Sequence, residues 1–230
     1  MRFGEFDLVI ILDACRADCF ATHYGAYSAL SRGEFRAVFS HAIDTQSFYA
    51  ALPSKLTREF ILISGHPGLN SVKTWGELNA SSMFKRVIDS WANNWIAELC
   101  TSSPEQVLRD ALKWLDAKLW VHFVQPHAPL PTLRSIPKRS FLTNAMQQFE
   151  LAAQGEIGVG ELKKAYIDNL LWVLPYANIL AAKALERGKR VLVTADHGDA
   201  LGEDGCFGHG FEHPAVRCVP WLEIEPRGGA

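Results

Sequence analysis

The sequence predicts an α/β fold, a three-layer α/β/α sandwich around a mostly parallel central sheet. Short apolar runs alternate with helix-like segments along the 230 residues, which is typical of parallel sheets that helices cover on both faces. The apolar runs are also continuous, as in strands buried on both faces. We predict one domain over residues 1–230, with a loop-rich cap segment around residues 126–160.

The first quarter of the chain supplies two strands and two helices. Residues 6–13 form a continuous apolar run that ends at Asp13, and residues 15–25 follow as a helix that stops at a glycine. Residues 35–41 are the second expected strand, and residues 45–52 are a short helix ended by a proline. The first strand is therefore expected at the centre of the sheet.

The next segment is expected to add a third strand and a helix. Residues 59–65 are apolar and lead into a turn rich in glycine and proline. Residues 82–99 show helical spacing, with Trp91 and Trp95 on one face. We expect these two tryptophans, and Trp75, to pack in the core.

A well-marked helix and a fourth strand follow. Residues 104–117 begin with a proline at the first helical position, and Ser103 precedes it as the cap. Residues 118–125 are the strand, which runs into a proline-rich loop over residues 126–139. Because that loop can form neither a strand nor a long helix, we interpret it as a lid or a substrate contact.

The last third of the chain holds one long helix and two strands. The helix is expected over residues 160–187, kinked or broken near Pro175. The strands are expected over residues 189–196 and 219–225. In sheets of this kind, ligands bind outside the carboxyl ends of the strands.

The overall composition excludes several classes of protein. The formal net charge is −2 and no basic block occurs, so no nucleic-acid partner is expected. No apolar run approaches the roughly 20 residues of a membrane span, and residues 1–18 fit a first strand better than a signal peptide. The five cysteines form no CxxC pair. A reducing compartment, hence a cytoplasmic location, is predicted.

Polar residues gather where the expected strands end. Asp13 ends the first strand, and Asp196 and His197 end the fifth. Two carboxylates and an imidazole can hold a divalent cation, for which Zn²⁺ and Mn²⁺ are the best candidates. The alternative is that both aspartates cap the helices that follow them. We favour a metal; without one, the two carboxylates would repel each other and one would have a raised pKa.

A hydroxyl nucleophile is available at Thr45, at the start of the helix that follows the second strand. The positive end of the helix dipole, together with a metal, would make its alkoxide accessible near neutral pH. The alternative is that Thr45 or Asp44 is a plain N-cap. Ser47 and Ser40 are weaker candidates for the nucleophile.

Loop residues complete the candidate set. His127, between prolines, is expected in an exposed loop, where it would bind an anionic group or protonate a leaving oxygen. His209 lies in a glycine-flanked loop and could complete a metal site. Arg16 could clamp a phosphate oxygen or pair with Asp18. Of the other histidines, one is left undecided, His213, and four are expected to be structural: His23, His41, His66 and His122.

Four segments occur in the order seen in the alkaline phosphatase and sulfatase superfamily, which the chain resembles: VIILDACRAD, DTQSF, FVQPHAPL and VTADHGDALGEDGCFGHG. It looks most like the sulfatase-like hydrolases of archaea and their viruses. The last segment also resembles the lipid A phosphoethanolamine transferases and lipoteichoic acid synthases. The resemblance implies an alkaline phosphatase-like fold. It also implies that Asp13, Asp196 and His197 are metal ligands, and that Thr45 is a nucleophile that touches the metal.

The same resemblance implies that His127 and His209 contact the transferred group or help to hold a second ion. The chain lacks the mid-chain Asp-x-x-x-His pair of two-zinc phosphodiesterases, so one metal site is expected and a second is left open. It also lacks the C/S-x-P-x-R block of sulfatases. An unmodified Thr45 therefore suits phosphate esters better than sulfate esters.

The sequence thus predicts a metal-dependent hydrolase or transferase of phosphate mono- or diesters, acting through a covalent threonine intermediate. The substrate would be a small-molecule, lipid or glycan ester. A sulfatase is the second candidate, and a non-catalytic metal-binding member of the fold is the third. A phosphomutase is disfavoured by the short chain. A homo-oligomer is left open, because a partner subunit could complete the substrate pocket.

Overall fold

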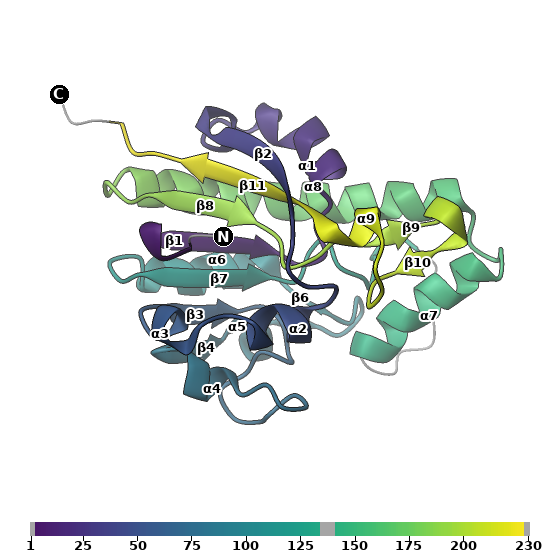
Figure 1. The fold of residues 1–230 in the computed structure, drawn as a ribbon, viewed down its shortest axis with the longest axis horizontal. Helices are drawn as coiled ribbons and strands as arrows, with labels where there is room; N and C mark the ends of the chain where they lie inside the picture. The colour runs from purple at the N-terminus through teal and green to yellow at the C-terminus, as the bar shows by residue number, and fades with distance from the viewer. Residues whose placement is uncertain (1–2, 134–140, 228–230) are drawn as a thin grey trace.

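The computed structural model describes residues 3–133 and 141–227, and its centre is a seven-stranded sheet in the order β2-β11-β8-β1-β7-β3-β4 (Figure 1). β11 runs antiparallel to both of its neighbours, and the remaining pairs are parallel. The predicted mostly parallel sheet is therefore confirmed. The strands are β1 (Leu8–Leu12), β2 (Glu34–Phe39), β3 (Ile61–Ser64), β4 (Arg86–Asp89), β7 (Leu119–Phe123), β8 (Val191–Thr194) and β11 (Cys218–Ile224).

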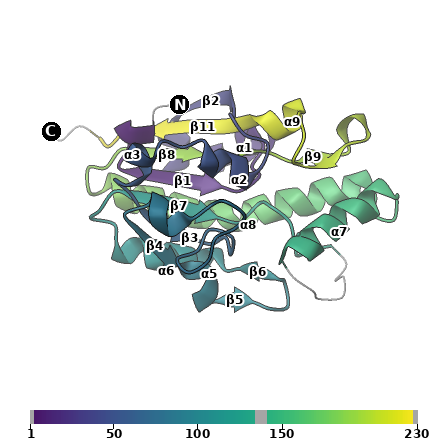
Figure 2. The same ribbon diagram turned by 60° about the horizontal axis from the view of Figure 1, so that its bottom comes forward.

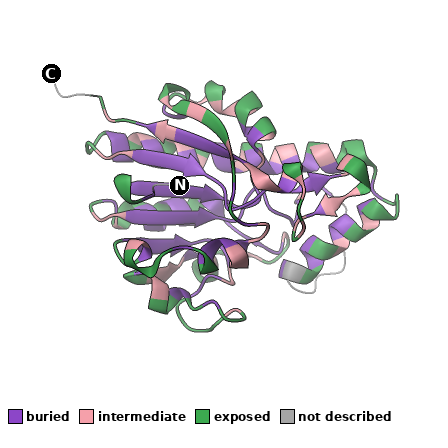
Figure 3. Cartoon of the chain, viewed as in Figure 1, coloured by how far each residue is buried: buried purple, intermediate pink, exposed green. Residues whose placement is uncertain are grey.

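Helices cover both faces of the sheet, which confirms the three-layer α/β/α prediction (Figures 1 and 2). One face carries α1 (Ala17–His23), α6 (Pro104–Lys113) and α8 (Val159–Leu185). The other carries α2 (Thr45–Ala50), α3 (Ser54–Thr57) and α4 (Ala80–Met83). Alternate residues of β1 pack into the two cores, and all five are buried. This two-sided burial is the reason that the strand sequence is continuously apolar (Figure 3).

A third apolar cluster lies beyond the carboxyl ends of the strands (Figure 1). There α7 (Phe141–Ala153) packs with the first half of α8 and with the hairpin of β9 (Ala200–Leu201) and β10 (Phe207–Gly208). The segment around residues 126–160 that was predicted to be a loop-rich cap therefore contains the helix α7. Its proline-rich part is a loop over residues 126–133, and residues 134–140 lie outside the described part of the chain.

Two further predictions about helices differ from the structure. Residues 82–99 do not form one helix: they are divided among the end of α4, β4, α5 (Ser90–Asn93) and β5 (Trp95–Ile96), which pairs with β6 (Thr101–Ser102). Trp91 and Trp95, whose spacing suggested a helix, instead line a cavity. The long helix α8 continues through Pro175, and the residues on both sides of this proline pack in the core against the sheet.

The remaining short elements are α9 (Pro214–Arg217) and four 3-10 helices over Phe3–Glu5, Tyr24–Ala26, Leu30–Arg32 and Glu203–Gly205. Ser103 stands at the N-cap position of α6 as predicted, but its side chain makes no capping hydrogen bond. All five cysteines are free. Within residues 3–133 and 141–227, no helix combines the length and the apolar character that a membrane span requires.

Candidate active site

The pairing of β1 with β8 brings the two predicted carboxylate ligands together. The strands are parallel, with Ile11 opposite Thr194, so Asp13 and Asp196, each two residues further on, face each other beyond the strand ends. Both side chains are completely buried, and so is that of His197. The sequence prediction that these residues meet at the carboxyl edge of the sheet is therefore confirmed.

The imidazole of His197 lies at the centre of a set of acceptor atoms. Its Nδ1 lies 3.0 Å from the carbonyl oxygen of Gly198, which leaves Nε2 as the acceptor in a neutral ring. This Nε2 lies 3.6 Å from Oδ1 of Asp13 and 3.7 Å from Oδ2 of Asp196. Oγ1 of Thr45 is 3.4 Å away. Apart from the Thr45 hydroxyl, the set contains only acceptors.

The two carboxylate oxygens in this set have no hydrogen-bond partner among the described residues. Buried carboxylate oxygens without a donor are costly unless a cation compensates them. Ligand atoms of Asp13, Asp196 and His197 lie within 4.8 Å of one another. Two carboxylate oxygens, one imidazole nitrogen and a hydroxyl are a donor set that suits Zn²⁺ or Mn²⁺. The residues present therefore fit a divalent metal.

The capping roles considered for Asp13 and Asp196 do not match the structure, whereas the alternative that Asp44 is an N-cap is confirmed. Oδ1 of Asp196 accepts the backbone N–H groups of Ala14 and His197 within the loops, and neither aspartate caps a helix. The N-cap of α2 is Asp44, which accepts the N–H of Ser47, so the Thr45 hydroxyl is left to face His197. Ser47 and Ser40 are the two weaker candidates for the nucleophile. The hydroxyl of each donates a hydrogen bond to a backbone carbonyl oxygen.

A hydrogen-bonded chain orients the carboxylate of Asp13. The indole N–H of Trp120 donates to the hydroxyl oxygen of Tyr49 over 3.0 Å. The Tyr49 hydroxyl therefore donates onward to Nδ1 of His122 over 2.8 Å. The Nε2–H of His122 then donates to Oδ2 of Asp13 over 3.0 Å. His122, which was expected to be structural, is fully buried and determines which oxygen of Asp13 is free.

The charge environment of Asp13 differs from the expectation as well. Burial alone would raise its pKa, but the facing His127 and the hydrogen bond from His122 outweigh burial and hold the pKa well below its ordinary range. The predicted raised pKa from repulsion between two carboxylates is therefore wrong for Asp13. Surrounding histidines, which the sequence analysis could not place around this residue, are the reason.

A second cluster adjoins the first through His197. Nδ1 of His209 lies 2.7 Å from Oδ1 of Asp199, and the rings of His197 and His209 are 4.2 Å apart. Burial would lower the pKa of His209, but the charge of Asp199 outweighs it and raises the pKa to about 9. Asp199 was not among the predicted site residues, although its position in the same segment as Asp196 was a usable signal. His197, Asp199 and His209 have ligand atoms close enough together to hold a metal ion.

His127 is buried, whereas the flanking prolines led us to expect exposure. Its backbone N–H donates to the carbonyl oxygen of Asp13 over 3.0 Å, and Nδ2 of Asn169 in α8 donates to its carbonyl oxygen. These bonds fold the loop onto the site. Burial lowers the pKa of His127, and Nδ1 bonds the carbonyl oxygen of Ala128. Nε2 of the neutral ring is therefore an acceptor near His209, whose ring is 5.0 Å away.

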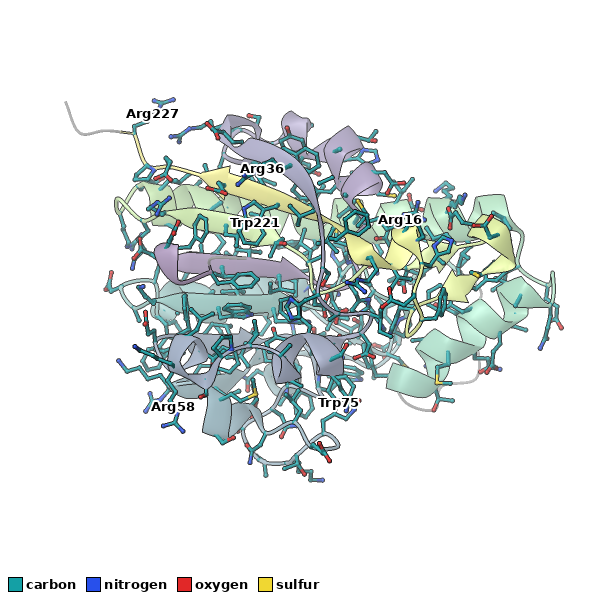
Figure 4. All side chains as sticks on the ribbon, in the orientation of Figure 1. Arg16, Arg36, Arg58, Trp75, Trp221 and Arg227 are labelled. Atoms are coloured by element: carbon teal, nitrogen blue, oxygen red, sulfur yellow. The ribbon has the colours of Figure 1, made fainter. Side chains whose placement is uncertain are left out.

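Arg16 takes the second of the two roles that the sequence left open. Its guanidinium donates to both oxygens of Asp18, and its NH1 nitrogen donates to Glu203 and to the carbonyl oxygen of Asp199 (Figure 4 labels Arg16). These contacts join the loop after β1 to the loop after β9. The predicted phosphate contact of Arg16 receives no support from this arrangement.

No family model matches the chain, and no curated protein matches its sequence. Solved structures do share its fold. The integral membrane lipooligosaccharide phosphoethanolamine transferase A of Neisseria meningitidis has a TM-score of 0.65 at 14% identity, covering 96% of this chain and 47% of its own. The C-terminal periplasmic domain of EptC from Escherichia coli, in complex with Zn, has a TM-score of 0.62 at 10% identity, covering 96% and 72%. The lipoteichoic acid synthase LtaP of Listeria monocytogenes has a TM-score of 0.57 at 11% identity, covering 99% and 67%.

These structures confirm the alkaline phosphatase-like fold, and the chain spans about half the length of the full transferase. At such low identities the likeness concerns the fold alone. The predicted closeness to archaeal and viral hydrolases is untested and stays a prediction. Two of these proteins are described as an integral membrane protein and a periplasmic domain, so they give no support to the predicted cytoplasmic location.

Proposed function

We propose that this protein is a metal-dependent hydrolase or transferase of phosphate esters, in the alkaline phosphatase and sulfatase superfamily, with Thr45 as its nucleophile. The observation that carries the proposal is the convergence of Asp13 Oδ1, Asp196 Oδ2 and His197 Nε2 beside the Thr45 hydroxyl. Buried acceptors without donors call for a cation, and the adjacent hydroxyl supplies a group that can attack.

Asp13, Asp196 and His197 would hold the metal, with Thr45 beside it. When bound, a divalent metal supplies charge stabilisation to the oxygens of a transferred phosphoryl group and favours an ionised hydroxyl. The Tyr49–His122 chain keeps one oxygen of Asp13 engaged and the other free. The protein's own contribution at this point is orientation, achieved before any substrate arrives.

Oγ1 of Thr45 loses its proton to solvent and forms the new bond to phosphorus, while the bond from phosphorus to the leaving oxygen breaks and that oxygen takes up a proton. In the second step, the oxygen of water or of an acceptor alcohol attacks phosphorus and releases Thr45. His127, with its acceptor Nε2, is positioned to take the proton of that incoming oxygen, and in the reverse sense to return it to a leaving oxygen. Microscopic reversibility makes these one role.

A cavity of about 450 Å³ opens beside His127 and His209 and gives the ester group a place. Its other walls are mainly apolar, with Phe149 of α7 and Phe207 of β10 among them. Such a lining accommodates the apolar part of an ester better than a highly charged one. A lipid or other apolar phosphate ester is thus the substrate that this cavity favours.

Phosphate esters are preferred over sulfate esters because the nucleophile position holds Thr45, which cannot be converted to the formylglycine of sulfatases. Retention of the complete set of acceptors argues against a non-catalytic member of the fold, since unpaired buried carboxylates would be a cost without a benefit. Both alternatives remain outcomes of the experiment.

The test is hydrolysis of an aryl phosphate, a diaryl phosphate and an aryl sulfate by the metal-stripped chain, with and without added Zn²⁺ or Mn²⁺. Thr45→Ala should lose turnover by at least about 10³-fold, whereas Thr45→Ser should retain part of it. Zn²⁺ binding is measured separately by calorimetry. Turnover that survives in Thr45→Ala would remove the nucleophile assignment. Zn²⁺ binding without turnover of any ester would favour the non-catalytic alternative, and cleavage of the sulfate alone would favour a sulfatase.

A further inference from the structure

A second cavity, of about 480 Å³, lies on the other side of the metal-ligand cluster and is lined by aromatic rings. Three segments build it: the loop after β3 with His66 and Trp75, the α5–β5 segment with Trp91 and Trp95, and Phe141 at the start of α7 (Figure 4 labels Trp75). The three tryptophans were expected in the core. Each is instead only partly buried and contributes to the lining of this cavity.

The rings form an ordered wall. Trp75 stacks on His66 with centroids 4.8 Å apart, and Phe141 contacts His66 edge-on at 5.2 Å. Trp95 meets Phe141 at 6.1 Å. Gly68 permits the stack, because a Cβ there would lie 2.3 Å from Cε3 of Trp75. The loop sequence is therefore shaped to hold an indole in this place.

The cavity adjoins the metal ligands through two contacts. The ring of His66 lies 5.8 Å from that of His122, which bonds Asp13 directly. On the other side, Phe141 stacks on His127 at 5.5 Å. The cavity therefore borders the rings that surround the metal ligands.

The polar groups that line this cavity are mainly donors. The amide of Asn70 is engaged within its own loop, and the hydroxyl of Thr74 can donate or accept. The indole N–H of Trp91 is shielded from the cavity, so Trp91 contributes its ring. Nδ1 of His66 accepts the N–H of Gly68, and burial lowers the pKa of His66 to about 3, so the neutral ring carries its proton on Nε2. Lys73 adds an ammonium group at the exposed rim. Within the described part of the chain, no carboxylate lines this cavity, and no acceptor bonds Nε2 of His66 or Nζ of Lys73.

We propose that this aromatic cavity binds a planar ring that carries hydrogen-bond acceptors or a negative charge, as in aryl carboxylates and nucleobases. The inference rests on the proposed function for its role, since the bound ring would be the organic part of a phosphate ester or of an acceptor alcohol. Flat rings match the stacked walls, and acceptors match the Nε2–H of His66 and the ammonium of Lys73. An ammonium group would contact aromatic faces here. It would meet no carboxylate among the lining residues, and Lys73 would repel it.

Binding is tested by tryptophan fluorescence on the full chain, stripped of metal with a chelator. The probes are benzoate, uridine, cyclohexanecarboxylate and benzylammonium. Benzoate or uridine should bind at least about threefold more tightly than the other two, and which of them is tighter distinguishes a charged aryl group from a base. Trp91→Phe should weaken the preferred probe about three- to tenfold, because the smaller ring removes part of the aromatic wall. Trp114→Phe, at the C-cap of α6 and outside the lining of the cavity, is the control.

Two results overturn the proposal. One is equal affinity of Trp91→Phe and Trp114→Phe for benzoate and uridine; the other is tighter binding of benzylammonium than of either. Lys73→Met adds a second measurement that does not depend on the core, and it should weaken benzoate while leaving uridine unchanged. If Lys73→Met leaves benzoate unchanged as well, the charge complementarity is refuted.

A kinetic comparison separates this inference from the proposed function. If esters are cleaved, Trp91→Phe should lower kcat/KM for an aryl phosphate about three- to tenfold and leave an alkyl phosphate unchanged. Equal effects on both esters would place the organic group elsewhere. If no ester is cleaved but the fluorescence results hold, the proposed function fails while the cavity assignment stands.

Discussion

The two histidine–carboxylate clusters share His197 but differ in how their charges are satisfied. In the first, Asp13 and Asp196 each direct an oxygen without a hydrogen-bond partner toward the single imidazole of His197. In the second, Asp199 also has one such oxygen, but its other oxygen is 2.7 Å from His209, whose raised pKa supplies a cation within the cluster. The first cluster therefore requires a cation, and the second is largely neutralised by its own ion pair. This difference teaches that proximity of ligand atoms alone does not identify a resident metal site.

The largest expected effect separates the two clusters by their aspartates. Asp196→Asn should lose the bound metal and at least about 10³-fold of ester hydrolysis, because it removes a charge from the unneutralised cluster. Asp199→Asn should keep about one metal per chain. Metal content after dialysis and turnover of an aryl phosphate measure both. Equal metal loss in the two variants would show that the clusters act as one site.

The next largest effect concerns the hydrogen bonds from Trp120 through Tyr49 and His122 that orient Asp13. Tyr49→Phe should weaken Zn²⁺ about 10- to 100-fold, as is usual when a residue that orients a ligand is lost. The measurement is competition with a chelating dye, and Tyr27→Phe, at the partly exposed Tyr27, is the matched control. Unchanged affinity in Tyr49→Phe would mean that the free oxygen of Asp13 is set by packing alone.

A smaller effect is expected in thermal stability, where metal binding should again distinguish Asp196 from Asp199. Zn²⁺ at about 100 times its dissociation constant should stabilise the native chain by about 2.7 kcal/mol, which for a chain of this size raises the Tm by roughly 5–10 °C. Asp199→Asn should show nearly the same increase, and Asp196→Asn should show none. Differential scanning calorimetry decides this, and stabilisation of Asp196→Asn would contradict the assignment of the first cluster.

The smallest effect concerns Glu203, which supports the segment carrying the second cluster through Arg16 and Lys163. Burial raises its pKa, but the N–H of Leu201 and these cations outweigh burial and lower it from 4.5 to about 2. A depressed pKa means that the stabilisation is present above pH 4.5 and is lost as the pH falls toward 2. Glu203→Gln should cost about 0.5–1 kcal/mol at pH 7 and nothing near pH 2.

Urea unfolding at a series of pH values measures that difference, with Glu156→Gln at an exposed position as the control. A cost that persists at pH 2 would show that Glu203 acts through packing and not through its charge. First-cluster metal affinity should be the same in Glu203→Gln as in the native chain.

The core strands and the first cluster were predictable because their signals are local. A strand buried on both faces needs an unbroken apolar run, and Asp13, Asp196 and His197 stand directly at the ends of such runs. Parallel pairing then leaves little freedom in where their side chains meet. The same reasoning located Thr45 at the start of α2, since a polar residue that follows a strand and opens a helix has a defined place.

Errors arose where a local pattern has two structural solutions. Helical spacing over residues 82–99 fitted a helix, but the tryptophans face a cavity formed with the loop after β3 and with α7. Prolines around His127 fitted an exposed loop, but hydrogen bonds to Asp13 and Asn169 draw that loop into the interior. In each case the deciding partner lies far away in the sequence.

The sequence by itself determined the layered architecture, the strand ends and the identity of the polar residues that stand there, because periodicity and the ends of apolar runs are set within a few residues. Only the tertiary structure decided which oxygen of each carboxylate is free, which histidine carries a charge, and that His122 and Asp199 join the site. Those properties depend on hydrogen bonds and burial contributed by segments that meet only after folding, and such contacts leave no local pattern in the chain.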